Sequence, residues 1–342
     1  MSGLFFRRRP RRGRSGLAGL LGAALLAPSL ALAQCAGQDL RQSADPALWA
    51  EVEAEMAAMP YARGLSWRAT RGDRELRLIG TLHLNDPRHA PIVAALAPEI
   101  RAADALLVEI NRQDKARADR QLLAQPELIY ITEGPTLIDR LPDPAWQQVA
   151  RLAQAAGIPP FAAAKMRPWF LSMSLSVPLC ARRIPDVAHG LDQQLMVLAE
   201  EAGVAVRSLE EAMTVFQALN ADPLDKQVAD LSSYIALMGV EEDEFHTMLE
   251  SYFDGAFEAF NLLQTKAFLR AEMEVPVAER QRQLDEVLEA LLYQRNRDWV
   301  PVIEAQAGDR LVVAVGAAHL PGERGLLALL AAEGYVITEA PL

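Results

Sequence analysis

The chain has 342 residues, and its 45 acidic residues outnumber its 34 lysines and arginines, giving a formal net charge of −11 at pH 7. Six of the arginines and none of the acidic residues lie within residues 1–33, so the remaining 309 residues carry 28 basic and 45 acidic residues, a net charge of −17. This charge argues against binding of nucleic acid or anionic lipid through the overall field. After residue 33 no run of 18 uncharged apolar residues occurs, so we expect a soluble product with no membrane span.

Residues 1–33 have the layout of a secretory signal peptide. The six arginines lie between residues 7 and 14, and the apolar stretch Leu17–Leu32 that follows contains no charge. Glycine, proline and serine interrupt this stretch, which makes it a poor membrane anchor. A small-x-small pattern ends at Ala33. We therefore expect cleavage near Ala33 and a periplasmic or secreted protein that begins at Gln34, by either the general or the twin-arginine route.

Cys35 and Cys180 are the only cysteines of the chain. An oxidising compartment would let them pair, so we predict a disulfide that ties the N-terminal segment to the body of the protein. Two alternatives stay open at this point. The first is a pair of unpaired thiols with Cys180 buried, and the second is lipidation of Cys35, for which Gln34 is a poor preceding residue.

Two stretches far apart in the sequence share the pattern strand, Gly-x-x-His, helix, strand. The first comprises a strand at 75–79, Gly80–His83, a helix at 87–101 and a strand at 105–110. The second comprises a strand at 311–315, Gly316–His319, a helix at 323–333 and a strand at 335–338. Strands that alternate with helices of this length predict an α/β fold with a parallel or mixed central sheet.

A third unit of related kind comprises Gly190-Leu191-Asp192, a helix at 193–202 and a strand at 204–207, with Asp192 as the predicted helix N-cap. The stretches 126–179 and 211–303 carry Leu, Ala and Met at helical spacings and few strand signals. We therefore predict a single α/β domain over residues 34–342, in which these two stretches are helical insertions that form a layer or lobe on the sheet.

The two motif histidines and one glutamate are the candidate functional residues. In an open α/β sheet, ligands bind at the carboxyl ends of the strands, and His83 and His319 each follow a strand end. Glu109 ends an otherwise apolar strand, where a carboxylate has to be paired, hydrogen-bonded or metal-bound. Two imidazoles and a carboxylate can bind a metal and leave positions open for water. The alternative is that each histidine is a hydrogen-bonded structural residue.

We expect the three side chains to meet at one sheet edge, with Glu109 on the strand beside the first motif strand. Arg295 and Asn296, on a predicted helix, are candidates for orienting a substrate carbonyl or carboxylate, although Arg295 also fits a charged surface. Asp192 admits a second role, holding a ligand histidine in its tautomer. Four further residues complete the polar set: Arg88 as a candidate neighbour of the crevice, His89 as a surface residue, and His189 and His246 as residues outside the site.

Five groups of residues carry a resemblance to a known family. They are Gly80-Thr81-Leu82-His83 with Asp86-Pro87-Arg88, Leu107-Val108-Glu109, Gly190-Leu191-Asp192, Arg295-Asn296 with Trp299, and Val315–Gly322 with Gly325-Leu326-Leu327. In this order they resemble the TraB/PrgY/GumN family, which includes the Tiki proteins that inactivate Wnt ligands by cleaving them. Members of the family are regarded as unusual metal-dependent hydrolases or metalloproteases that favour manganese or cobalt, and their fold resembles those of erythromycin esterase and the haem-binding ChaN proteins.

The resemblance implies that His83, Glu109 and His319 bind a divalent metal ion, with manganese and cobalt as the candidate ions. Glu109 is then either a metal ligand or the general base, and Arg295 and Asn296 assist catalysis. We expect a periplasmic metal-dependent hydrolase, a peptidase whose substrate is a peptide or protein. The alternative, suggested by ChaN, is a non-catalytic protein that binds haem, metal or peptide at the same residues.

Overall fold

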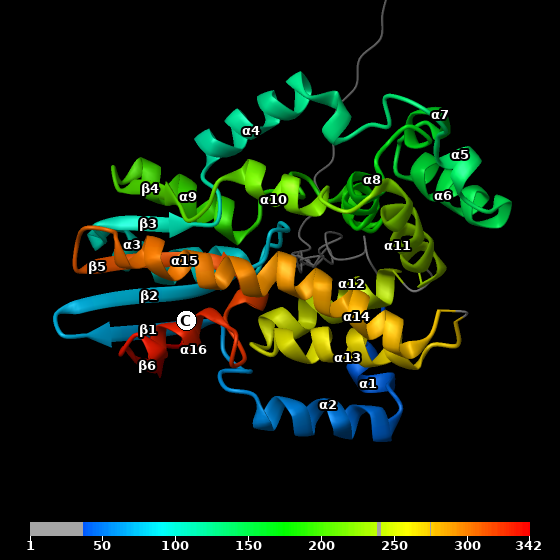
Figure 1. Ribbon diagram of the computed structural model, residues 1–342. Coiled ribbons are helices and arrows are strands. Elements are labelled where there is room, and N and C mark those ends of the chain that lie inside the picture. The colour runs from blue at the N-terminus through cyan, green and yellow to red at the C-terminus, as the bar shows by residue number, and fades with distance from the viewer. Residues whose placement is uncertain (1–36, 238–240, 274) are drawn as a thin grey trace, which may run out of the picture. The chain divides into compact units, whose positions relative to one another are not determined.

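A computed structural model describes residues 37–237, 241–273 and 275–342, which belong to one compact unit. The predicted signal peptide, its cleavage site and Cys35 lie outside the described residues. A six-stranded sheet has the order β4-β3-β5-β2-β1-β6 (Figure 1). The strands are β1 (Ser66–Arg71), β2 (Arg74–Thr81), β3 (Ala105–Val108), β4 (Ala205–Ser208), β5 (Arg310–Gly316) and β6 (Val336–Glu339).

The sheet is mixed and mostly parallel, which confirms the predicted α/β class. β2 and β3 pair in parallel with β5, and β4 pairs in parallel with β3, whereas β1 runs antiparallel to both β2 and β6. Sequence analysis did not predict the strand β1, because arginine and threonine interrupt its apolar pattern. Of its side chains, Trp67 and Ala69 belong to the hydrophobic core. The strand after the second motif, β6, lies at the far edge of the sheet beside β1.

One expectation about strand order is wrong. Glu109 follows β3, which neighbours the second motif strand β5 and not the first motif strand β2. The strand β5 lies between them and is buried on both faces, with Leu311 to Val315 at most 2 % exposed. A strand that is apolar throughout is the one that can occupy the centre of such a sheet.

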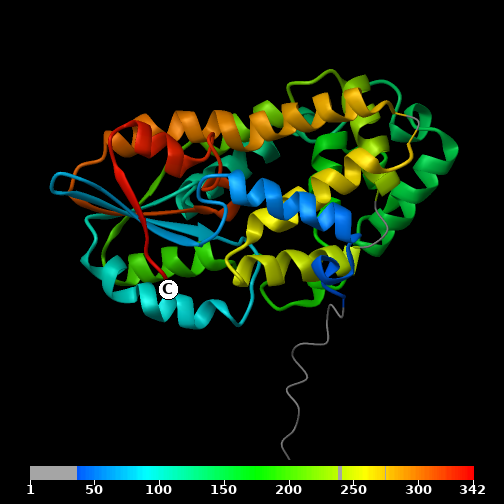
Figure 2. The same cartoon turned by 90° about the horizontal axis from the view of Figure 1, so that it is seen from below.

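Helices cover both faces of the sheet (Figure 2). On one face, Leu96 of α3 (His89–Ala102) and Leu195 of α9 (Leu191–Glu201) pack against Ile79 and Val312. On the other, Trp299 of α15 (Gln294–Glu304) and Leu330 of α16 (Leu326–Ala332) pack against strand residues such as Leu78 and Val313. These layers keep α9 and α15 close to the carboxyl ends of the parallel strands.

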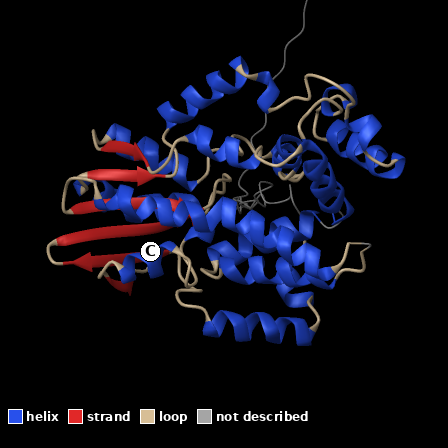
Figure 3. Cartoon of the chain, viewed as in Figure 1, coloured by secondary structure: helices blue, strands red, loops and turns tan. Residues whose placement is uncertain are grey.

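The two predicted insertions are helical, as Figure 3 shows. The stretch 126–179 contains α5 (Leu137–Arg140), α6 (Asp143–Ala155), α7 (Pro160–Ala163) and α8 (Pro168–Leu175), and a separate core joins it to α11. The stretch 211–303 contains α10 (Ala212–Leu219), α11 (Leu224–Leu237), α12 (Glu241–Phe253), α13 (Phe257–Arg270), α14 (Val277–Leu288), the π-helical segment Glu289–Tyr293 and most of α15. The remaining helices are α1 (Leu40–Ser43), α2 (Pro46–Ala58) and α4 (Arg112–Ala124).

Among the residues that the structure describes, no helix combines the length and the apolar character that crossing a membrane requires.

The predicted disulfide between Cys35 and Cys180 stays a prediction, and the surroundings of α12 favour it. The backbone N–H of Gln38 donates to Asp243 of this helix, and Cys180, 5 % exposed, packs against Phe245 two residues further along it. We expect peptide mapping under non-reducing conditions to recover the two cysteines in one cross-linked fragment. Recovery of both as free thiols from protein exported to an oxidising compartment would contradict the prediction.

Glu258, in the first turn of α13, provides a test of stability against pH. Burial and the charge of Glu55 raise the pKa of Glu258 to about 7, although Asn261 donates a hydrogen bond to it. Its ionisation therefore destabilises the folded state increasingly between about pH 4.5 and pH 7. We expect Glu258→Gln to raise the free energy of unfolding by on the order of 3 kcal/mol at pH 8 and by little at pH 4.5. Urea denaturation at both pH values measures this, and an equal effect at the two would contradict it.

Candidate functional site

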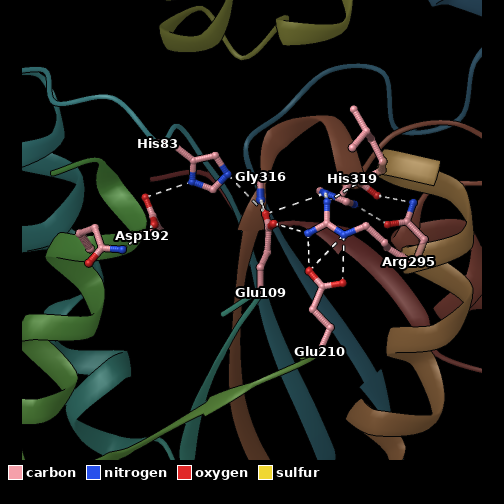
Figure 4. A network of polar contacts seen from close by, with 10 residues as sticks. His83, Glu109, Asp192, Glu210, Arg295, Gly316 and His319 are labelled. Carbon is pink, nitrogen blue, oxygen red and sulfur yellow. Dashed lines mark hydrogen bonds and ion pairs between the residues drawn. The ribbon is translucent and has the colours of Figure 1, made fainter. Parts of the chain in front are cut away.

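The carboxyl ends of β2, β5 and β3 bring the three predicted residues together (Figure 4). In the sheet, Thr81 lies opposite Gly316 and Val108 opposite Ala314, so the segments that follow these strands leave one edge. Glu109 Oε1 lies 3.6 Å from His83 Nε2 and 3.9 Å from His319 Nε2. The two imidazoles are therefore at most 7.5 Å apart at these nitrogens, despite the 236 positions that separate them in the chain.

Glu109 is held by hydrogen bonds on both of its oxygens. Oε1 accepts from the backbone N–H of Gly316 at 2.7 Å, and Oε2 accepts from Arg295 Nη2 at 2.6 Å. Burial raises the pKa of this carboxyl, but the close contact with His83 and the charges of His83 and Arg295 outweigh burial and hold the pKa well below its usual range. Glu109 is thus an ionised carboxylate fixed at the centre of the site.

Asp192 holds His83 from the side opposite Glu109. Its Oδ1 lies 3.3 Å from His83 Nδ1, which leaves Nε2 directed at Glu109. The predicted N-cap role is wrong, because Gly190 is the N-cap of α9 and Asp192 lies within the first turn. A Cβ at Gly190 would lie 2.3 Å from the carbonyl oxygen of Leu82, so only glycine lets α9 approach the His83 segment this closely.

His83 and His319 differ in environment. Burial lowers the pKa of His83, but its contacts with Asp192 and Glu109 outweigh burial and raise the pKa to about 10. The His83 side chain is 59 % exposed, so solvent screens these charges. The His319 ring is 4 % exposed, and burial, with the charges of Arg295 and His83, lowers its pKa to about 3.

Asn296 sets the tautomer of His319. Its Nδ2 donates to the carbonyls of His319 and Arg324, at 3.3 and 3.0 Å, which turns its Oδ1 toward the His319 ring. His319 Nδ1–H then donates to that oxygen at 2.7 Å, and the lone pair stays on Nε2. The ring also packs on Trp299, with 4.4 Å between centroids. Asn296 is 1 % exposed and therefore acts through His319.

Arg295 links the site to a residue that sequence analysis did not include, Glu210. Arg295 Nε lies 3.1 and 3.0 Å from the two carboxylate oxygens of Glu210, while Nη2 reaches Glu109 and Nη1 lies 3.3 Å from His319 Nε2. Burial and the charge of Glu109 raise the pKa of Glu210, and Arg295 opposes them. The sequence pattern could have indicated Glu210, because this residue follows the end of β4 much as Glu109 follows the end of the neighbouring strand β3.

A profile of the TraB/PrgY/gumN family matches residues 65–339. The chain belongs to this family. The same range contains every residue of the site just described. Two relatives, from Escherichia coli strain K12 and from Shigella flexneri, are each named "Uncharacterized protein YbaP"; each is 25 % identical over 259 residues, which cover 76 % of this chain and 89 % of the relative.

Other polar residues of this TraB/PrgY/gumN family member lie outside the network. Arg88 is bound by Asp86 and Glu250 and lies over the ring of Phe253. The expectation that His89 is a surface residue is wrong: it begins α3 with no exposed area and packs against the rings of Tyr252 and Phe253. The two excluded histidines, His189 and His246, are exposed and half-buried, respectively.

The two imidazoles and the Glu109 carboxylate are ligand types that suit a divalent ion. Arg295, however, already contacts Glu109 and His319. Within the described residues no group of three or more His, Cys, Asp and Glu side chains is already gathered as a metal site. Two ligand atoms bound to one tetrahedral ion at about 2.1 Å lie roughly 3.4 Å apart. The two His–Glu109 distances, 3.6 and 3.9 Å, are long for hydrogen bonds and close to this ligand–ligand separation.

Gly316 leaves the space that these ligands would share. A Cβ at this position would lie 3.2 Å from Glu109 Oε1, 3.5 Å from His83 Nε2 and 3.6 Å from His319 Cδ2. All three candidate ligands therefore border one small opening that glycine keeps free. His319 Nδ1 is also hydrogen-bonded to Asn296, and His83 Nδ1 lies 3.3 Å from the Asp192 carboxylate. A second partner of this kind orients the histidine ligands of metals.

An open groove of about 990 Å³ lies beside the site. Glu210 and Arg295 are among the residues that line it, and its walls come from α10, α14, the π-helical segment and α15. Apolar side chains such as Val215 and Ala290 alternate there with charged ones such as Arg324. A chain segment lying in this groove would reach the Arg295 guanidinium.

Proposed function

We propose that this TraB/PrgY/gumN family member is a metal-dependent hydrolase of the periplasm that cleaves peptide bonds. The observation that carries the proposal is the convergence of two oriented imidazole nitrogens on one ionised carboxylate oxygen around the opening at Gly316. His83, Glu109 and His319 would hold the ion. When bound, a divalent ion supplies Lewis acidity and a water of lowered pKa.

The chain's own residues would prepare and position the substrate. Asp192 and Asn296 hold the two imidazoles with Nε2 facing the ion site. The Arg295 guanidinium offers planar donors that suit the oxygen of a scissile carbonyl or a substrate carboxylate. Glu109 acts as a ligand or as the base that accepts a proton from water, a role that requires about 2.6–3.2 Å between the two oxygens.

The groove supports a peptide as the substrate, because it is open, is lined by residues of several helices and has a partly apolar lining. The proposed location rests on the arginine-rich and apolar segment at residues 1–33.

The deciding experiment measures cleavage of a peptide library by purified protein with Mn²⁺, Co²⁺, Zn²⁺ or a chelator. We expect cleavage that depends on one of these ions and disappears on chelation. Binding of haem with a strong visible absorption band, together with no cleavage under any of these conditions, would overturn the proposal in favour of a binding protein.

The role of the groove is tested by Ala290→Trp, which places a large ring in its wall. We expect peptide cleavage to fall by about tenfold or more, equivalent to roughly 1.4 kcal/mol, because the substrate is displaced. Metal affinity should stay at the wild-type value, since Ala290 contacts the groove and not the ion site. Leu123→Trp, on the exposed face of α4, is the matched control. Equal activity of the two variants would exclude the groove as the substrate site.

A further inference from the structure

Arg295 is shared between two carboxylates that have different surroundings. Its Nη2 donates to Glu109 at 2.6 Å, while its Nε contacts both oxygens of Glu210 and a third contact joins Nη2 to Glu210. Its Nη1 also donates to the carbonyl oxygen of Leu291, in the π-helical segment, at 2.7 Å. The guanidinium is therefore held mainly by contacts other than the one with Glu109.

This arrangement conflicts with a cation at the proposed metal site. Arg295 donates to the Glu109 carboxylate and lies 3.3 Å from His319 Nε2, the nitrogen whose lone pair a metal would use. A divalent ion and a guanidinium on the same two groups repel each other, and at 15 % exposure little water screens the Arg295 charge. Metal binding thus requires Arg295 to break its hydrogen bond with Glu109 and to move away from His319.

We propose that Glu210 is the positioning residue that retains Arg295 when Glu109 and His319 take up a metal ion. This inference rests on the proposed function. The Glu210 side chain is 11 % exposed, so a second carboxylate is already in place and desolvated beside the guanidinium. The Glu210 carboxylate is hydrogen-bonded to Arg295, and within the described residues neither His83 nor His319 is among its partners, so Glu210 would not itself be a metal ligand. Transfer to Glu210 keeps a buried arginine paired while the carboxylate of Glu109 becomes available.

The released donors of Arg295 then face the substrate. Glu210 and Arg295 both line the groove, so a guanidinium drawn to Glu210 remains beside the bound peptide. Its Nη2, no longer engaged by Glu109, is the donor that a substrate oxygen would meet. Glu210 therefore couples metal uptake to the presentation of the substrate-binding cation.

The test is a double-mutant cycle on metal affinity, measured by calorimetric titration of the metal-free protein with MnCl₂ and with CoCl₂. We expect Glu210→Gln to weaken binding by about tenfold or more, the range of residues that support metal ligands, because Arg295 then has Glu109 as its one carboxylate. Arg295→Met should bind the ions at least as tightly as wild type. Adding Glu210→Gln to Arg295→Met should change the affinity by less than about twofold.

Two further variants separate this role from simple charge or folding effects. Glu211→Gln removes the next carboxylate along the chain, which also lines the groove, and should leave the affinity unchanged. Glu210→Asp keeps the charge and should recover part of the affinity even where Glu210→Gln lowers the melting temperature.

The outcomes are distinguishable. A wild-type protein that binds neither ion overturns the proposed function and this inference together. A wild-type protein that binds metal while Glu210→Gln binds equally well overturns the inference alone. An equal loss from Glu210→Gln with and without Arg295 also overturns it, because the carboxylate would then act directly on the ion.

Discussion

Replacing His319 by alanine is expected to abolish metal-dependent peptide cleavage and to weaken binding of Mn²⁺ or Co²⁺ by more than about 100-fold, a loss greater than that caused by altering the partners of metal ligands. The ring is buried, and its Nε2, which keeps the lone pair, lies 3.9 Å from Glu109, whose carboxylate borders the opening beside Gly316. Loss of several kcal/mol of transition-state stabilisation corresponds to a fall in kcat/KM of roughly 1000-fold.

His83→Ala should have the same effect on metal binding with a smaller effect on stability, because its side chain is 59 % exposed whereas that of His319 is 4 % exposed. Calorimetric titration, cleavage assays and melting temperatures measure these differences. His189→Ala, at an exposed position outside the network, is the matched control. Unchanged metal content and unchanged cleavage in both site variants would remove the shared metal centre.

Gly316→Ala is expected to weaken metal binding without destabilising the fold. The backbone of Gly316, at φ −51° and ψ 138°, suits alanine, so the substitution brings no strain of its own. Its Cβ would lie 3.2 Å from Glu109 Oε1 and 3.5 Å from His83 Nε2, inside the opening that the ligands border. We expect a loss of metal affinity of about 10- to 100-fold, as for displaced ligands, with a melting temperature close to that of wild type.

Gly80→Ala, at the equivalent place in the first motif, is the contrasting variant. Its Cβ would meet the Cα of Ala317 at 3.1 Å and the side chain of Leu320, so we expect a loss of stability there rather than a specific loss of metal binding. Calorimetry and thermal denaturation of the two variants give the comparison. Wild-type metal affinity in Gly316→Ala would show that no ion uses this opening.

Local patterns determined the main elements and all three central residues. The apolar run at 311–315 predicts a strand buried on both faces, and β5 is the central strand of the parallel part of the sheet. A histidine placed after glycine at the end of a parallel strand reaches the same rim wherever that strand lies. This is why His83 and His319 could be paired from sequence, and why Glu109, a charge in an apolar strand, could be added to them.

Only the tertiary structure decided which strands adjoin and which partners each side chain takes. The sequence predicts strands but not the order in which they pair, so the position of β5 between β2 and β3 could not be predicted. Asp192 looked like a helix cap because local signals report on its own helix, whereas its contact with His83 comes from the close approach of α9 at Gly190. Glu210 became a partner of Arg295 because α15 packs across the sheet, a contact between residues 85 positions apart that no periodic pattern encodes.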